Sequence, residues 1–143
     1  MREILFKAKR ESTGEWVEGF YAKRHGVPYI YENADCPQSI YEINPDTLCQ
    51  YTGLTDKNGR KIWENDIVRW IDKLYKVSFY DSMCSFVLVT STGHWNHMEM
   101  NYGNKLECFD YEVVGNVFDN PDLLKATTET IGYADQSGLM SAT

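Results

Sequence analysis

Apolar and polar residues alternate along this chain in short runs, and turn-forming residues interrupt the runs at close intervals. In residues 3–9, Ile4, Phe6 and Ala8 fall on one face of an extended segment, and most of the charged side chains fall on the other. Residues 11–14 form a turn, and residues 16–21 return as a second strand, so an N-terminal β-hairpin is predicted. The alternation predicts an all-β fold.

Similar runs continue to about residue 118. The remaining strands are predicted at 27–31, 39–43, 61–63, 67–71, 74–80, 85–90, 106–109 and 111–118, and residues 93–103 are predicted as a loop. Asn44-Pro45-Asp46 is a turn signal, and Asn58-Gly59 predicts a type I′ hairpin turn. Residues 121–124 can start one short helical turn. Short strands separated by frequent turns are typical of a small barrel or sandwich.

Composition restricts the class of protein. The 143 residues fit one domain or two small ones, and 43% hydrophobic with 14% aromatic residues is enough to form a core. No apolar run reaches the roughly 18 residues that a membrane span needs, and the charged N-terminus does not resemble a secretion signal. We expect an N-terminal β-region at 1–50, a barrel region at 51–124, and a poorly ordered tail, or an arm that docks on a neighbouring subunit, at 125–143.

The four cysteines lie at positions 36, 49, 84 and 108. Zinc ribbons and redox motifs need two sulfurs about two to four residues apart, and these cysteines are much more widely spaced. We therefore expect reduced thiols in a cytoplasmic protein that has no cofactor. Two disulfides are the alternative for an even number of cysteines.

The net charge of −7 is unevenly distributed. Residues 1–24 contain six basic and four acidic side chains, whereas the rest of the chain contains eight and seventeen. Nucleic-acid binding depends on a basic surface, so the overall charge disfavours it, but a local basic group at the N-terminus keeps it open. The candidate nucleic-acid contacts are the basic side chains and two tyrosines that could stack on bases: Arg2, Lys7, Lys9, Arg10, Lys23, Arg24, Tyr29 and Tyr31.

Few residues are arranged as a reactive site. His94, His97 and Glu99 place three metal donors within six residues, but two histidines three apart point to opposite faces of a strand, and an ordinary polar loop is the alternative. No nucleophile motif or phosphate-binding loop is present. Glu64 and Asp66 could share a proton, but beside a tight turn we expect them to be solvated or to bond turn amides. The sequence thus predicts no catalytic residue.

Three segments together resemble a known family. The central segment, Q-Y-T-G-L-T-D-K-N-G-R-K-I-W-E-N-D-I-V at 50–68, is similar to the signature of the YopX family of phage and prophage proteins. The opening I-L-F-K-A at 4–8 and the closing Y-E-V-V-G-N-V-F-D-N-P-D-L-L at 111–124 also resemble that family. Asn65 stands where the family usually has glycine, and asparagine tolerates the left-handed backbone that such a turn requires.

The resemblance implies an SH3-like barrel in the second half, joined to an N-terminal β-region. It also implies a phage genome as the source, the cytoplasm of a bacterial host as the location, and self-association, but it implies no reaction. We expect a non-enzymatic accessory protein that binds a host or phage protein, with a nucleic-acid-binding module as the alternative. The hairpin at 4–20 carries more apolar bulk than a two-stranded ribbon can bury, so we expect a homo-oligomer formed through this hairpin. A monomer in which the hairpin packs on its own barrel is the other outcome.

Overall fold

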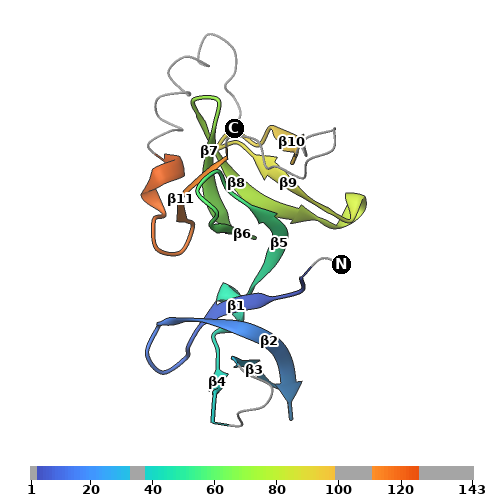
Figure 1. Ribbon diagram of the computed structural model, residues 1–143, viewed down its shortest axis with the longest axis vertical. Coiled ribbons are helices and arrows are strands. Elements are labelled where there is room, and N and C mark those ends of the chain that lie inside the picture. Colours follow the sequence, from blue (N-terminus) through green and yellow to red (C-terminus); the bar gives the residue numbers. More distant parts are fainter. Residues whose placement is uncertain (1–2, 33–37, 99–110, 126–143) are drawn as a thin grey trace. The chain divides into compact units, whose positions relative to one another are not determined.

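The computed structural model describes residues 3–32, 38–98 and 111–125 (Figure 1). The predicted strand at 106–109 lies outside these residues, as does the predicted tail apart from Lys125. The chain divides into two compact units, Met1–Gly53 and Leu54–Thr143, and each unit is described by itself. No helix among the described residues has the length and apolar character needed to cross a membrane.

The strands form two antiparallel sheets. The strand orders are β4-β3-β2-β1-β5-β6 and β10-β9-β8-β7-β11. The first unit contains β1 (Phe6–Lys9), β2 (Trp16–Arg24), β3 (Val27–Tyr31), β4 (Ile40–Glu42), the 3-10 turn η1 (Pro45–Thr47) and most of β5 (Cys49–Thr55), which crosses the unit boundary. The second unit contains β6 (Lys61–Trp63), β7 (Asp66–Trp70), β8 (Lys73–Tyr80), the 3-10 turn η2 (Asp81–Met83), β9 (Ser85–Val89), β10 (Trp95–His97) and β11 (Glu112–Asn116).

The first unit buries one face of its sheet. Ala8, Val17, Ile30 and Ile43 form the core cluster, and partly buried aromatic and aliphatic side chains pack around it. Gly19 in β2 lies against the backbone of β3, because a Cβ atom at this position would overlap the carbonyl oxygen of Tyr31. Only glycine leaves room for that approach of two backbones.

The second unit has its own core. Residues from β6, β7, β8, β9 and β11 and the residue before β11 form it: Ile62, Val68, Tyr75, Val77, Leu88, Tyr111 and Val113. Two cores, each made of alternate residues from short strands, explain why the sequence shows alternation rather than long apolar runs.

The structure confirms the all-β class and the N-terminal hairpin, but an SH3-like barrel is not confirmed, because neither sheet closes. In the second sheet β10 and β11 are the two end strands and do not pair with each other. Asn44 caps η1 as the turn signal predicts: its side-chain oxygen accepts a hydrogen bond from the Asp46 amide at 3.0 Å. Residues 122–125 are helical, consistent with the predicted short turn.

Two details of the prediction are wrong. The Asn58-Gly59 turn is not type I′, because only Gly59 has a positive φ; type I′ turns occur instead at His25-Gly26 and Ile71-Asp72, where both residues have positive φ. The predicted loop at 93–103 contains the short strand β10. β1 pairs with β2 and, through Phe6 and Lys7, with β5, whereas β2 pairs with β1 along Trp16–Gly19 and with β3 along Phe20–Arg24. The homo-oligomer expected through this hairpin stays a prediction.

Candidate functional site

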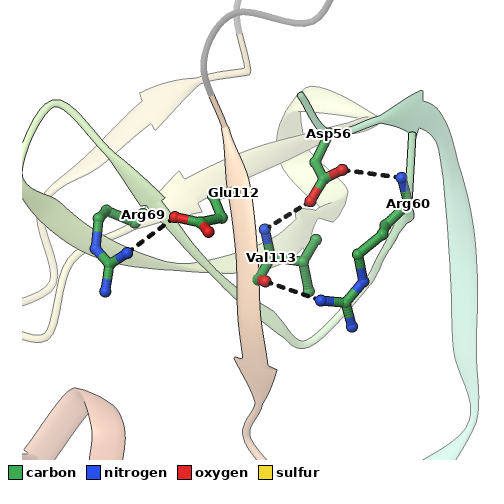
Figure 2. Close-up of polar contacts among 5 residues, drawn as sticks. All are labelled: Asp56, Arg60, Arg69, Glu112 and Val113. Atoms are coloured by element: carbon green, nitrogen blue, oxygen red, sulfur yellow. Dashed lines mark hydrogen bonds and ion pairs between the residues drawn. The ribbon is translucent and has the colours of Figure 1, made fainter. Parts of the chain in front are cut away.

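The turn between β5 and β6 holds a buried carboxylate, Asp56, which is only 5% exposed. Its Oδ1 accepts hydrogen bonds from the amides of Asn58, at 2.8 Å, and Arg60, at 2.9 Å. Its Oδ2 accepts a third hydrogen bond, at 3.0 Å, from the amide of Val113 in β11 (Figure 2). One side chain therefore shapes its own turn and also attaches that turn to a strand much later in the chain.

This turn covers the side of β11 that faces away from β7. Besides the bond from the Val113 amide to Asp56, the Arg60 guanidinium donates to the Val113 carbonyl at 3.3 Å, and the Lys57 amide donates to the Tyr111 carbonyl at 2.9 Å. The other side of β11 pairs with β7, where Arg69 forms an ion pair with Glu112 at 2.9 Å. Figure 2 shows the two sets of contacts on opposite sides of the strand. The backbone groups of Val113 that a further strand would use are thus occupied.

The hydrogen bonds also set the charge state of Asp56. Burial by itself would raise the pKa of this carboxyl, but the amides of Val113, Arg60 and Asn58, together with the Arg60 charge, hold the pKa below its ordinary value. A carboxylate that stays ionised at neutral pH and accepts three backbone hydrogen bonds is suited to hold a turn. A proton donor or acceptor near pH 7 needs the opposite shift.

The other acidic residue of the central motif has a similar role. Asp66 is 2% exposed, and its Oδ2 accepts a hydrogen bond from the Trp63 amide at 2.9 Å. Of the two predicted alternatives, solvation or a bond to a turn amide, Asp66 is not solvated and instead bonds the amide at the end of β6, directly before the turn. Asn65, between β6 and β7, has a φ of 71°. This is the left-handed backbone conformation expected at a position where the family usually has glycine.

The loop that follows β11 is also held by side chains. The Asn116 side-chain oxygen accepts hydrogen bonds from the amides of Phe118 and Asp119, both at 2.9 Å, and the Asn120 side-chain oxygen accepts one from the Asn116 amide at 3.2 Å. A Cβ atom at Gly115 would lie 2.5 Å from that Asn120 oxygen. The central and closing motifs therefore contain residues that build turns and core, which is what we expect of motifs that specify a fold.

A second candidate site is the face of the first unit's sheet that lies opposite its core. Directly paired residues share a face, so the strand register identifies its members. We call this surface the outer face. It consists of Lys7, Lys9, Trp16, Glu18, Phe20, Ala22, Arg24, Val27, Tyr29, Tyr31, Ile40, Glu42 and, at its buried β5 edge, Cys49. Phe20, paired with Tyr31, is 51% exposed.

The outer face contains five of the eight candidate nucleic-acid contacts. They are Lys7, Lys9, Arg24, Tyr29 and Tyr31. Arg10 and Lys23 are paired with Ile43 and Pro28 and belong to the opposite face, where the Arg10 guanidinium lies over the Tyr41 ring at 4.4 Å. Arg2 lies outside the described residues.

The charges on the outer face are mixed. The ammonium groups of Lys7 and Lys9 lie 4.6 and 5.4 Å from the centre of the Trp16 ring, and Glu18 is the direct cross-strand partner of Lys7. Three cations and two carboxylates thus share a surface with four aromatic rings. Such a surface is more typical of protein recognition than of phosphate binding, which needs a predominance of basic side chains.

The histidine cluster is not assembled in the described part of the chain. His97 is in β10, and His94 directly precedes this strand, where its carbonyl accepts a hydrogen bond from the Thr90 amide. Because this segment is extended, two histidines three residues apart face opposite sides. The His94 ring nitrogen Nδ1 is 3.0 Å from the Thr92 hydroxyl, and the His97 ring packs against Trp95. No group of metal-binding side chains occurs among the described residues, and Glu99 lies outside them.

One feature was missed by sequence reasoning, and another was only partly predicted. Asp56 appears in the sequence as a turn residue, and nothing local shows that its second oxygen reaches Val113, 57 positions away. Phe20 was noted as part of the apolar bulk of the hairpin, but its exposed position follows from its place on the opposite side of the alternating strand from Val17. The sequence analysis noted the aromatic residues but did not assign them to faces.

The fold and these sites define a two-unit antiparallel β-protein whose motif residues mainly build turns, strand edges and cores. The chain matches the family described as YopX protein over residues 5–125, and it belongs to that family. No curated protein matches it. It is similar to the crystal structure of protein EF1440 from Enterococcus faecalis, with 20% sequence identity, a TM-score of 0.48, and coverage of 87% of this chain and 99% of that one.

Proposed function

We propose that this chain is a non-enzymatic accessory protein of phage origin that binds another protein through the outer face, in the cytoplasm of a bacterial host. The exposure of Phe20 beside Tyr31 supports this proposal most strongly, because large apolar side chains gathered on one face are typical of binding surfaces. The mixed charge of the face favours a protein over a nucleic acid as the partner.

Site-specific photo-cross-linking tests the proposal. Phe20 is replaced by a photoreactive phenylalanine analogue, the chain is produced in bacterial cells, and the cross-linked products are identified by mass spectrometry. Phe79 provides a matched control, because it is also an exposed phenylalanine, at 40%, but lies in the other unit. We expect one or a few defined protein products from position 20 and not from position 79.

Two results would count against the proposal. Equal, diffuse labelling from both positions would show that exposure alone explains the products. Salt-dependent binding of single- or double-stranded oligonucleotides, measured by fluorescence anisotropy and lost when Lys7 and Lys9 are both replaced by alanine, would favour the nucleic-acid alternative.

A further inference from the structure

The turn between β5 and β6 contains the dipeptide Asn58-Gly59, which occurs once in the sequence. Asparagine is one of the chemically labile residues of proteins, because a backbone amide nitrogen can attack its side-chain amide. The attack is easiest where glycine follows, since glycine has no Cβ atom to obstruct the approach. Asn58 and Gly59 are both exposed, and nothing lies within 4 Å of a Cβ atom added to Gly59. The site is therefore sterically open to this reaction.

The reaction needs only water as a second reactant. The Gly59 nitrogen forms a bond to Cγ of Asn58 and loses its proton to solvent, while the side-chain nitrogen takes up a proton and leaves as ammonia. Water then opens the resulting cyclic imide at either of its two carbonyl groups. Opening at one carbonyl gives aspartate. Opening at the other gives isoaspartate, in which the main chain runs through the side-chain Cγ and gains one carbon atom.

The native turn restrains the attacking nitrogen. The Gly59 amide donates its hydrogen to the Asp56 carbonyl at 3.0 Å, and the amides on either side of it, of Asn58 and Arg60, donate to Asp56 Oδ1 at 2.8 and 2.9 Å. The Gly59 nitrogen must give up its hydrogen, and the hydrogen bond with it, before it can attack. Ring closure therefore follows opening of the turn, and its rate depends on how often the turn opens.

Both products weaken the turn. The carbon atom that isoaspartate adds lies between positions 58 and 59, inside the stretch of chain that the bonds from Gly59 and Arg60 to Asp56 close (Figure 2). Those two amides therefore move relative to Asp56. Aspartate instead places a second carboxylate two residues from Asp56, and like charges repel. Because the same turn bonds the amide and carbonyl of Val113, a weaker turn covers β11 less well.

We propose that Asn58-Gly59 is a self-modification site gated by the hydrogen bonds of Asp56. Opening of the turn lets Asn58 convert to aspartate and isoaspartate, and the converted turn covers Val113 less well than before. The conversion is one-way, because the ammonia is lost, so each chain records how long its turn has been open. The inference is independent of the proposed function, since it uses no residue of the outer face.

Peptide mapping by mass spectrometry follows the reaction in the full-length chain. Folded wild type kept in mildly alkaline buffer should accumulate both products at position 58 and none at Asn116, whose side-chain oxygen accepts two backbone hydrogen bonds and which valine follows. The same chain unfolded in guanidinium chloride should convert about tenfold faster or more, because no turn restrains it. Conversion in the unfolded chain alone, with none in the folded chain, would overturn the proposal.

Two variants of the turn test the gate. Asp56→Ala removes the side-chain acceptor of two turn amides and should speed conversion about tenfold. Arg60→Ala is milder, because it keeps the three bonds of the Asp56 side chain and loses only the guanidinium bond to Val113, and it should speed conversion severalfold.

Val77→Ala is the matched control for these variants. It opens a cavity in the core of the same unit but leaves the turn intact, so its conversion rate should stay near that of the wild type. Wild-type rates in both turn variants, or an equal acceleration in Val77→Ala, would show that the bonds of Asp56 are not the gate.

Hydrogen exchange tests the consequence for β11. Ion-exchange chromatography separates converted chains, which carry an additional negative charge, from unconverted ones. The Val113 amide should exchange about tenfold faster in the converted chains, because their turn opens more often. Asn58→Ser cannot convert, so its Val113 amide should stay as protected as in fresh wild type throughout the incubation. Equal exchange of Val113 in converted and unconverted chains would contradict the proposed loosening of the turn.

Discussion

At the scale of single residues, Asp56 accepts three backbone hydrogen bonds through one buried side chain. Its carboxylate accepts bonds from two amides of its own turn and one amide of β11. A buried amide that loses its acceptor costs more than the bond itself contributes, because the donor cannot reach water. The turn and the strand edge therefore depend on the same two oxygen atoms.

Replacing Asp56 by alanine should destabilise the protein by about 2 to 4 kcal/mol, since three backbone donors lose their acceptor and one of them belongs to the buried residue Val113. Urea denaturation followed by tryptophan fluorescence measures the change. Asp46→Ala serves as the control: its side chain is exposed in η1, and the loss should stay within about 0.5 kcal/mol. Similar losses for both variants would contradict the role assigned to Asp56.

The same carboxylate should make stability depend on pH in acid. Its pKa in the folded protein is below the ordinary value of 3.8, so as the pH falls the unfolded chain takes up the proton first. The stabilisation is fully present above the unfolded pKa and is lost as the pH falls through the folded pKa. Asp56→Asn cannot titrate, so its free energy of unfolding should fall less steeply below about pH 4 than that of the wild type. Parallel pH curves for the two proteins would contradict this.

At the scale of elements, the packing of β2 against the backbone of β3 depends on Gly19. A Cβ atom there would overlap the Tyr31 carbonyl oxygen, which is a backbone atom of the adjacent strand and cannot turn away as a side chain can. The β2–β3 pairing therefore tolerates no side chain at this position.

Gly19→Ala should cost at least about 3 kcal/mol, because the two strands must separate to admit the methyl group. Gly14→Ala is the matched control. Gly14 has a φ of 76° but nothing within 4 Å of an added Cβ atom, so only the left-handed backbone is penalised, at about 1 kcal/mol. Thermal unfolding of both variants distinguishes steric overlap from backbone preference; equal losses would show that the overlap is relieved cheaply.

Prediction from sequence succeeded where a local pattern determines the structure. The alternation at 16–21 and the capping residue Asn44 led to the correct strand and turn. Ile71 was assigned to a strand, because a β-branched apolar residue at the end of an alternating run normally continues it. The Asp56–Val113 bond joins distant segments and leaves no local trace, and β10 has only three exposed residues. The outer face was only partly predicted, since the candidate list did not separate the two faces of each strand.

At the scale of the whole molecule, the position of the N-terminal hairpin determines the expected effect of its removal. In the sheet order, β1 lies between β2 and β5, and β2 lies between β3 and β1. The hairpin also supplies Ala8 and Val17 to the core of the first unit. It is therefore an interior part of its sheet.

Deleting residues 1–22 should unfold the first unit and should not release intact monomers from an assembly. Methyl NMR spectra measure this directly: the resonances of Ile30 and Ile43, which pack against the deleted residues, should move to random-coil positions. Dispersed resonances for both isoleucines in the truncated chain would show that the hairpin is dispensable for folding.

The cover over β11 has a consequence for how the protein behaves at high concentration. A strand with unsatisfied backbone groups can template the growth of aggregates, and here the Val113 amide and carbonyl are already bonded to Asp56 and Arg60. Growth from this side of the sheet therefore requires the 56–60 turn to detach first. The lag time before aggregation should then become shorter as the free energy of that local opening becomes smaller. A substitution in the turn should shorten the lag time even where the midpoint of global unfolding changes little.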